Sequence, residues 1–318
     1  MSKMNRLKTI VKAPASIANL GPGFDILAMA IEGLYDVVEV EVSDGEGIVD
    51  VKTEGIFSVP EGPENVAYRV AKSFLDYYSI TNIDLRIKVV KGVPPASGLG
   101  SSGATSAATA YALAKLLRKD INESELLRLA AEGEALVAGT PHYDNVAASL
   151  FGNIVLIDLD KGKVYKIEPR IPIYIAVVLP KTPLRTDKKT GLARSVIPKS
   201  IDLHTHVKQQ SSLAKLIYAL MVGDIKLFGE AISADFVVEH HRAKLIPYYY
   251  ELKELALKLG ALGFNISGAG PSTFFVHKSY KEALSIGEKL ISFLKDKGVN
   301  SDLLVTRISD KGSEVIHQ

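Results

Sequence analysis

A glycine- and serine-rich run occupies residues 93–104, which read Val-Pro-Pro-Ala-Ser-Gly-Leu-Gly-Ser-Ser-Gly-Ala. It lies between a strand-like segment, 83–91, and an alanine-rich helical segment, 105–117. Glycines allow left-handed backbone conformations and a close approach to a ligand. Because the first turn of a helix leaves N–H groups unpaired and carries partial positive charge, the phosphates of ATP would suit this position. The hydroxyls of Ser101 and Ser102 could reach phosphate or a magnesium ion.

Two common nucleotide-binding motifs do not fit this run. It is not followed by the Gly-Lys-Ser/Thr of the usual phosphate loop. It also does not match the dinucleotide fingerprint with its later acidic residue. A glycine-rich turn capped by serine is in addition an ordinary way to begin a helix. The run alone therefore leaves a purely structural interpretation open.

Two further glycine-rich segments lie far from the first in the sequence. Residues 14–25 read Pro-Ala-Ser-Ile-Ala-Asn-Leu-Gly-Pro-Gly-Phe-Asp, and residues 265–272 read Asn-Ile-Ser-Gly-Ala-Gly-Pro-Ser. Together with residues 93–104, and in this order, they resemble the three motifs of the GHMP small-molecule kinases. The resemblance covers nearly the whole chain. Within that superfamily the first motif looks most like that of the homoserine kinases, and residues 191–198 and 242–247 agree with the same group.

Hydrophobic periodicity and turn signals predict alternating strands and helices in both halves of the chain. The expected strands are 9–13, 35–42, 48–53, 83–90, 152–159, 163–168, 173–179, 263–267, 273–277 and 301–305. The expected helices are 64–78, 105–117, 124–138, 144–150, 207–221, 225–235, 248–259 and 281–295. Such alternation favours a two-layer α+β architecture. A chain of 318 residues is long for one core, so we expect two domains, 1–169 and 170–318.

The resemblance implies the GHMP kinase fold, an α+β fold with a ribosomal-protein-S5-like N-terminal α/β domain and a ferredoxin-like C-terminal α+β sandwich. It also implies roles for single residues. The residues expected to bind ATP are Asn65, Pro94, Pro95, Ala96, Ser97, Gly98, Leu99, Gly100, Ser101, Ser102, Gly103 and Ala104. The residues expected at the substrate are Asn19, Asp25, His142, Asn145, Arg194 and Arg242. A magnesium ion is expected at Ser102 and Glu134, since magnesium prefers oxygen ligands.

The chemistry of homoserine agrees with this set. Its carboxylate could be held by Arg194 and Arg242, because a guanidinium forms two parallel hydrogen bonds to a carboxylate. Its ammonium could donate to Asp25. The hydroxyl end of homoserine is uncharged. Asn19 and Asn145 could form hydrogen bonds with this hydroxyl, and His142 could bond either the hydroxyl or the transferring phosphate.

Each of these residues also has an ordinary structural interpretation. The arginines could form surface salt bridges, Asp25 could cap a turn, and His142 could be a loop histidine. Glu134 could lie on a solvated helix face and Asn65 could begin its helix. The implied roles therefore depend on the residues meeting in one cavity.

The residue expected to take the hydroxyl proton differs among the GHMP kinases. Several GHMP kinases use an aspartate near the segment that contains Pro141, and this chain has Asp144 there. The homoserine kinase pattern instead puts Asn145 at the substrate, which leaves Asp144 to cap the following helix. Phosphoryl transfer has a loose transition state and can proceed by positioning and charge stabilisation. We therefore expect no dedicated carboxylate base.

Composition narrows the classes of function. The net charge of +2 implies no strong attraction to nucleic acid, and the absence of cysteine excludes disulfides and thiolate metal sites. No segment has the roughly 20 apolar residues of a membrane span. We expect a cytoplasmic homodimer in which the strand at 173–179 extends a sheet between two chains. Two alternatives stay open: a GHMP kinase acting on mevalonate or shikimate, and a non-catalytic ligand-binding regulator.

Overall fold

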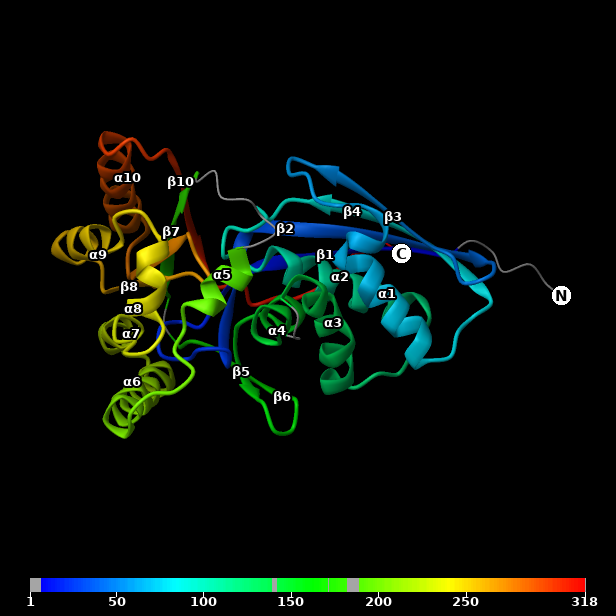
Figure 1. Cartoon of the computed structure of the whole chain (residues 1–318), viewed down its shortest axis with the longest axis horizontal. Coiled ribbons are helices and arrows are strands. Elements are labelled where there is room, and N and C mark those ends of the chain that lie inside the picture. Colours follow the sequence, from blue (N-terminus) through cyan, green and yellow to red (C-terminus); the bar gives the residue numbers. More distant parts are fainter. Residues whose placement is uncertain (1–6, 139–141, 171, 182–188, 318) are drawn as a thin grey trace.

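The structure is a computed structural model that describes residues 7–138, 142–170, 172–181 and 189–317. Its first half forms a seven-stranded sheet with four helices packed against one face (Figure 1). The strands are β1 (Leu7–Ala18), β2 (Leu27–Asp44), β3 (Val49–Gly55), β4 (Ile83–Lys91), β5 (Ile154–Asp158), β6 (Lys163–Ile167) and β11 (Glu314–His317). The helices are α1 (Val66–Tyr77), α2 (Ser101–Leu116), α3 (Glu123–Ala138) and α4 (Asp144–Phe151), with a short 3-10 turn at Gly62–Glu64.

The order of the first sheet is β11-β1-β2-β4-β3, and β5 pairs with both β2 and β6. β3 and β4 are parallel, whereas the other pairs are antiparallel. In β4 every second side chain is buried, because one face of the strand packs on the helices. β11 comes from the end of the chain, so both ends of the described sequence meet in this sheet. The boundary near residue 170 stays a prediction.

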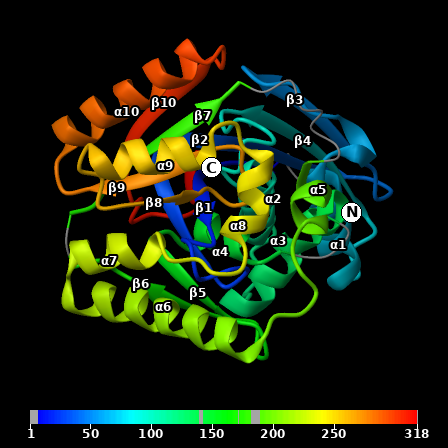
Figure 2. The same ribbon diagram turned by 60° about the vertical axis from the view of Figure 1, so that its left-hand side comes forward.

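The second half forms a four-stranded antiparallel sheet with helices around it (Figures 1 and 2). Its strands are β7 (Tyr174–Pro180), β8 (Gly263–Ile266), β9 (Thr273–His277) and β10 (Ser301–Arg307). The helices are α5 (Lys189–Ser195), α6 (Leu203–Val222), α7 (Ile225–Ile232), α8 (Glu239–Arg242), α9 (Tyr249–Lys258) and α10 (Tyr280–Asp296), with a 3-10 turn at Ala243–Leu245. The two halves together have the mixed helix and sheet architecture that the sequence predicts.

The position of β7 corrects one expectation. The sheet order is β10-β7-β9-β8, so β7 has a neighbour on each side. Its ladder hydrogen bonds are therefore already used, and it cannot extend the sheet into a second chain. The edges of this sheet are β10 and β8. A homodimer stays a prediction, but the route through β7 is wrong.

The predicted elements are present, and the differences have physical reasons. β2 begins at Leu27, eight residues before the expected strand. The expected start was too late because the first five residues of β2 are all buried and their sequence shows no apolar–polar alternation. α2 begins at Ser101 rather than at 105, so the last four residues of the glycine-rich run are the first turn of the helix. α5, α8 and β11 are short and carry no clear period, and the sequence analysis missed them.

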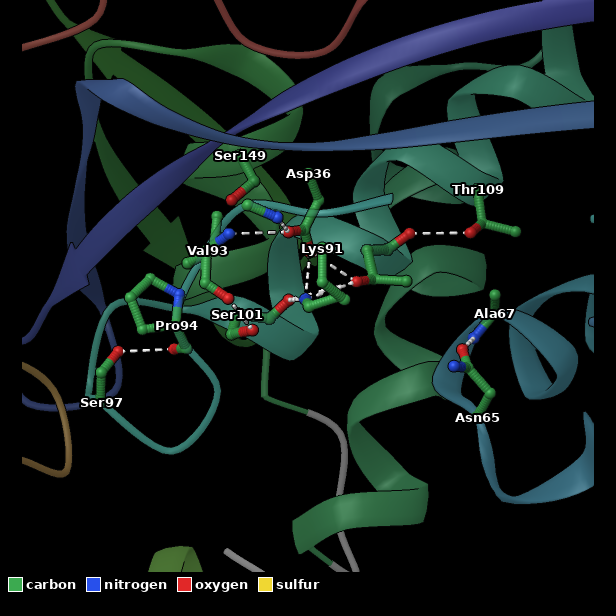
Figure 3. Close-up of polar contacts among 12 residues, drawn as sticks. Asp36, Asn65, Ala67, Lys91, Val93, Pro94, Ser97, Ser101, Thr109 and Ser149 are labelled. Atoms are coloured by element: carbon green, nitrogen blue, oxygen red, sulfur yellow. Dashed lines mark hydrogen bonds and ion pairs between the residues drawn. The ribbon is translucent and has the colours of Figure 1, made fainter. Parts of the chain in front are cut away.

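A buried ion pair lies under the glycine-rich run (Figure 3). Asp36 of β2 and Lys91 at the end of β4 are 0% and 3% exposed in their side chains and contact each other directly. One carboxylate oxygen of Asp36 accepts hydrogen bonds from the backbone N–H groups of Gly92 (3.1 Å) and Val93 (3.0 Å). The other oxygen accepts from the Thr105 hydroxyl at 2.6 Å. The carboxylate thus joins the beginning of the run to helix α2.

The lysine holds the other end of the run. Lys91 Nζ donates to the carbonyl oxygen of Ser101 and to the Thr105 hydroxyl, both at 3.0 Å. The Ser101 hydroxyl in turn donates to the carbonyl oxygen of Val93 at 2.9 Å. These contacts hold residues 92–93 and 101–105 together, so the segment between them is a closed loop with a rigid base. We call residues 93–100 the phosphate loop.

We expect Asp36→Asn to lower the free energy of unfolding by about 3–5 kcal/mol, because it leaves the Lys91 ammonium buried without its partner. Urea unfolding would measure the loss. Glu39→Gln is the matched control on the same strand: it breaks a half-buried pair with Lys8 (2.7 Å) and should cost less than about 1 kcal/mol. Adding Lys91→Met to Asp36→Asn should recover part of the loss. Equal effects of Asp36→Asn and Glu39→Gln would contradict the role given to the buried pair.

Candidate active site

A cavity of about 520 Å³ brings the three glycine-rich segments together. Its wall includes residues of the first segment, residues 95–98 and 100–102 of the central run, and residues 268–270 of the third segment. The wall also includes the beginnings of α1 and α4, Glu134 in the second half of α3, Arg194 of α5 and Arg242 of α8. Segments that are up to 250 residues apart in sequence therefore share one site, as the resemblance implies.

The phosphate loop packs directly on the third glycine-rich segment. The Ser267 hydroxyl donates to the carbonyl oxygen of Gly98 at 2.7 Å, and the Ser272 N–H donates to that of Ser97 at 3.2 Å. Gly98 has φ +86°, and a Cβ there would collide with the carbonyl oxygen of Ser267. Glycine is needed at this position both for its backbone conformation and for space.

Helix α2 begins at the end of the phosphate loop. Gly100 has φ +66° and is its N-cap residue. The Ala104 N–H donates to the carbonyl oxygen of Gly100 at 2.8 Å, which is the first hydrogen bond of the helix. The N–H groups of the preceding turn are those that a helix leaves for an anion. Ser101 and Ser102 line the cavity; the Ser101 hydroxyl donates to the carbonyl oxygen of Val93, whereas the Ser102 hydroxyl interacts with Glu134.

Opposite charges gather at another part of the cavity wall. Arg194 Nη2 lies 2.9 Å from Asp25 Oδ2, and Nη1 lies 3.3 Å from Oδ1, so the ion pair is bidentate. The guanidinium carbons of Arg194 and Arg242 lie 5.6 Å and 5.2 Å from the centre of the Phe24 ring. Both cations thus lie within reach of one aromatic ring, and both side chains line the cavity, which favours an anionic ligand there.

Arg242 is 5% exposed and tied to two backbone carbonyl groups. Its Nε donates to Ala193 at 3.1 Å and its Nη1 to Gly268 at 2.8 Å. The same Gly268 carbonyl accepts from Asn19 Nδ2 at 3.2 Å, and Asn19 Oδ1 accepts from the Asp25 N–H at 3.2 Å. Asn19 thus fixes the turn that carries Asp25. Burial lowers the pKa of Arg242, but an arginine stays charged at neutral pH.

His142 faces the same charged group. Arg194 Nη1 lies 3.3 Å from His142 Nδ1 and 3.4 Å from Nε2, and because arginine only donates, whichever ring nitrogen carries no proton is the acceptor. Burial lowers the pKa of His142. The negative charge of Asp25 raises this pKa, whereas the positive charges of Arg194 and Arg242 lower it further. The ring is therefore neutral near pH 7, and its 3.9 Å approach to Asp25 is not an ion pair.

Two buried carboxyl groups lie on the helices behind the loop. Burial raises the pKa of Glu134 to about 7, and the Ser102 hydroxyl and the Lys91 charge only partly oppose it. Among the described residues, Glu134 Oε1 has no hydrogen-bond partner. Burial and the negative charge of Asp25 raise the pKa of Asp144 to about 6. Asp144 is the first residue of α4, and its Oδ1 accepts from the Asn145 N–H at 2.8 Å.

Asn65 lies at the end of the cavity formed by residues 58–60 and 64–66. It is the N-cap of α1, and its Oδ1 accepts from the Ala67 N–H at 2.9 Å (Figure 3). Its Nδ2 donates to the carbonyl oxygen of Pro60 at 2.7 Å. The helix-initiating role and a place in the cavity wall are therefore both realised. A contact with a nucleobase stays a prediction.

Most of the predicted site residues line the cavity. All six expected substrate residues and both expected metal ligands do so, as do eight of the twelve expected ATP residues. The other four are not among the described residues of the wall: Pro94, Leu99, Gly103 and Ala104. Leu99 and Ala104 are fully buried in the hydrophobic core, and Gly103 packs on Asn145. Leu99, Gly103 and Ala104 therefore support the backbone of this segment from the side away from the cavity.

Four residues at or beneath the site were not predicted from the sequence: Asp36, Lys91, Phe24 and Ser16. A signal for Lys91 did exist, since it stands at a position of β4 where the alternation predicts a core side chain. A charged residue at such a position requires a buried partner. Asp36 was not identifiable as that partner, because only the pairing of β2 with β4 brings the two together.

Comparisons with known proteins agree with this geometry. Residues 65–153 match the model of the GHMP kinases N terminal domain, and residues 215–296 match that of the GHMP kinases C terminal domain. The chain is 39% identical over 313 residues to the homoserine kinase of Methanopyrus kandleri, covering 98% of this chain and 100% of that one. It is 39% identical over 279 residues to the homoserine kinase of Aeropyrum pernix, covering 86% and 88%.

A solved structure agrees over the same length. The crystal structure of homoserine kinase from Cytophaga hutchinsonii has a TM-score of 0.88 to this chain, at 33% identity and with 99% of each chain covered. The two domain matches, the arrangement of the three glycine-rich segments and the full-length relatives lead to one conclusion. The chain belongs to the homoserine kinases of the GHMP kinase family.

Proposed function

We propose that the chain transfers the γ-phosphoryl group of ATP to the hydroxyl of L-homoserine, giving O-phospho-L-homoserine for threonine biosynthesis. One observation carries the proposal: a single cavity joins a helix N-terminus suited to phosphates with a cluster of two arginines and an aspartate suited to an amino acid. The homoserine kinase relatives, which cover nearly the whole chain, support the same activity.

The charged cluster complements an amino acid rather than a simple acid. Arg242 and Arg194 offer two guanidinium groups to a carboxylate, and Asp25, with a side chain 26% exposed, offers oxygen atoms to an ammonium. Mevalonate and shikimate have a carboxylate but no ammonium, so neither would pair with Asp25. A non-catalytic regulator would not need the free Glu134 oxygen behind the loop.

The transfer step follows from these positions. The homoserine hydroxyl oxygen attacks the γ-phosphorus, the bond from that phosphorus to the bridging oxygen breaks, and ADP leaves with the electron pair. The hydroxyl proton passes to the phosphoryl oxygens, without a dedicated carboxylate base, because the transition state is loose. The hydrogen bond from the Asn145 N–H to Asp144 Oδ1 supports a role for Asp144 at the start of α4.

A magnesium ion fits beside the phosphate loop. The described residues contain no group of three or more His, Cys, Asp or Glu side chains that could hold a metal, so phosphate oxygens would have to supply further ligands. Glu134 Oε1 is buried without a partner and the Ser102 hydroxyl lies at the loop, so this pair would hold the ion. Bound there, magnesium would neutralise charge on the phosphates.

Among the described helices, none is long and apolar enough to cross a membrane. A cytoplasmic location and a homodimer remain predictions from the sequence.

The function is tested by ADP release in a coupled assay with ATP and magnesium. L-Homoserine should give turnover well above background, and mevalonate and shikimate should not. Release with mevalonate and none with homoserine would refute the proposed substrate and leave the kinase fold unaffected.

We expect Arg242→Ala to lower kcat/KM for homoserine at least about tenfold, because losing one partner of a buried charge pair costs about 2–5 kcal/mol. Arg194→Ala should cost less, since its side chain is 44% exposed and partly solvated. The KM for ATP should change little in either variant. Steady-state kinetics with each substrate varied would measure this.

Two controls make the arginine test specific. Arg307→Ala removes an exposed arginine paired with Glu32 at 3.5 Å and should leave kcat/KM unchanged. A homoserine analogue without the carboxylate should be used about equally poorly by the wild type and both variants. If the variants lose as much with the analogue as with homoserine, the arginines contact phosphate instead.

The pKa of Glu134 predicts how the need for magnesium depends on pH. Glu134 must be ionised to bind a cation, and with a pKa of about 7 its ionised fraction rises about tenfold from pH 6 to pH 8. The magnesium concentration for half-maximal activity should therefore fall as pH rises. Glu134→Gln should raise that concentration and flatten its pH dependence, and Ser102→Ala should raise it.

The control on the same helix is Glu132→Gln, which breaks a surface pair with Arg69 at 3.4 Å. It should behave as the wild type across the magnesium titration. A Glu134→Gln variant with an unchanged magnesium requirement would show that Glu134 is not a ligand.

A further inference from the structure

Ser16 links the phosphate loop to the residue expected at the reacting hydroxyl. It lies on β1 and is fully buried. Its hydroxyl donates to Asn145 Oδ1 at 2.9 Å, with the Asn145 backbone oxygen at 3.3 Å. Its backbone N–H donates to the carbonyl oxygen of Leu99, inside the phosphate loop, at 3.0 Å. Ser16 thus contacts both the loop that would hold ATP and the asparagine that is expected to contact the substrate hydroxyl.

The space around this contact is closed. A Cβ at Gly100 would collide with the Ser16 hydroxyl and would lie 2.7 Å from Asn145 Oδ1. Gly103, one turn along α2, would place a Cβ 3.1 Å from Asn145 Cβ. The Asn145 side chain is therefore packed against the beginning of α2, and its oxygen has little room to turn away from Ser16.

The orientation of the amide determines what Asn145 can do. Its oxygen is directed to Ser16, while the side chain also lines the cavity. In the part of the chain that the structure describes, no hydrogen bond from Asn145 Nδ2 to another residue is found, so its two N–H groups are the polar atoms left for a ligand. An amide nitrogen donates and cannot accept.

We propose that Ser16 is a positioning residue that holds Asn145 with its amide nitrogen toward the reacting oxygens. Asn145 is then a hydrogen-bond donor to the transferring phosphoryl group or the hydroxyl oxygen, and it does not accept the hydroxyl proton. The proposal rests on the proposed function, because it assumes that phosphoryl transfer takes place beside Asn145. A preorganised donor acts most strongly on the charge of the transition state, so its misplacement should appear mainly in kcat.

The chain offers a closely matched control. Ser149 on α4, which is drawn in Figure 3, is also fully buried. Its hydroxyl donates to the carbonyl oxygen of Pro14 on β1 at 2.8 Å. Ser16→Ala and Ser149→Ala each remove one buried hydroxyl that joins β1 to α4. Of the two hydroxyls, only that of Ser16 donates to the Asn145 side chain. Similar decreases in melting temperature in the two variants would show that they perturb the fold equally.

We expect Ser16→Ala to lower kcat with homoserine about tenfold, a loss typical of a misplaced catalytic contact, while the KM for ATP changes less than about twofold. Ser149→Ala should keep the wild-type kcat. In an Asn145→Ala background, adding Ser16→Ala should lower kcat by less than about twofold, because the group that it positions is gone. Asn145→Asp, which puts an acceptor in place of the donor, should be less active than Asn145→Ala.

Several results would overturn the proposal. If Ser16→Ala and Ser149→Ala have the same kcat, Ser16 has only a structural role. The same holds if Ser16→Ala lowers kcat as much in the Asn145→Ala background as in the wild type. Asn145→Asp more active than Asn145→Ala would show that Asn145 accepts. If the wild type phosphorylates another alcohol instead of homoserine, the same variants are assayed with that alcohol. An error in the proposed substrate can then be distinguished from an error in the role of Ser16.

One readout does not need turnover. The side-chain amide signals of Asn145 in ¹⁵N-labelled protein can be assigned by their loss in Asn145→Ala. They should shift and broaden in Ser16→Ala and stay unchanged in Ser149→Ala. Unchanged signals in Ser16→Ala would show that Ser16 does not hold the amide.

Discussion

The buried Asp36–Lys91 ion pair is the constraint on which the site depends. A loop that presents its N–H groups to an anion cannot use those groups to hold itself in place. Here the task falls to side chains: Asp36 binds the N–H groups at the beginning of the loop, and Lys91 binds the carbonyl oxygen at its end. Burying two charges is costly, and it is tolerated because their hydrogen-bonding groups find partners. The stability of the fold and the shape of the phosphate site thus depend on the same pair.

The rest of the site is built outward from this base. The third glycine-rich segment packs on the loop through Ser267, and its Gly268 carbonyl binds both Asn19 and Arg242. The backbone of a single glycine thus connects the residues expected to bind phosphate with those expected to bind an amino acid. These contacts connect the two ends of the cavity, whose relative position matters because phosphoryl transfer is in line.

Much of this arrangement could be predicted from the sequence. The three glycine-rich segments identified the family, and alternation located strands such as β4 and helices such as α1. What could not be predicted depends on pairing between distant segments. The partner of Lys91 follows from the register of β2 with β4, and the orientation of Asn145 follows from the contact of β1 with α4. The roles of short elements such as α8, which carries Arg242, depend on tertiary contacts and leave no periodic signal.

The central claim is that one cavity holds ATP on the phosphate loop and homoserine on the arginine cluster, with the hydroxyl facing the γ-phosphate. The most direct test is a crystal structure with homoserine, magnesium and a non-hydrolysable ATP analogue. The account predicts phosphates on the N–H groups at the start of α2, the carboxylate on Arg194 and Arg242, and the hydroxyl beside Asn145. A nucleotide bound away from residues 98–104, or homoserine with its carboxylate toward the phosphates, would contradict it.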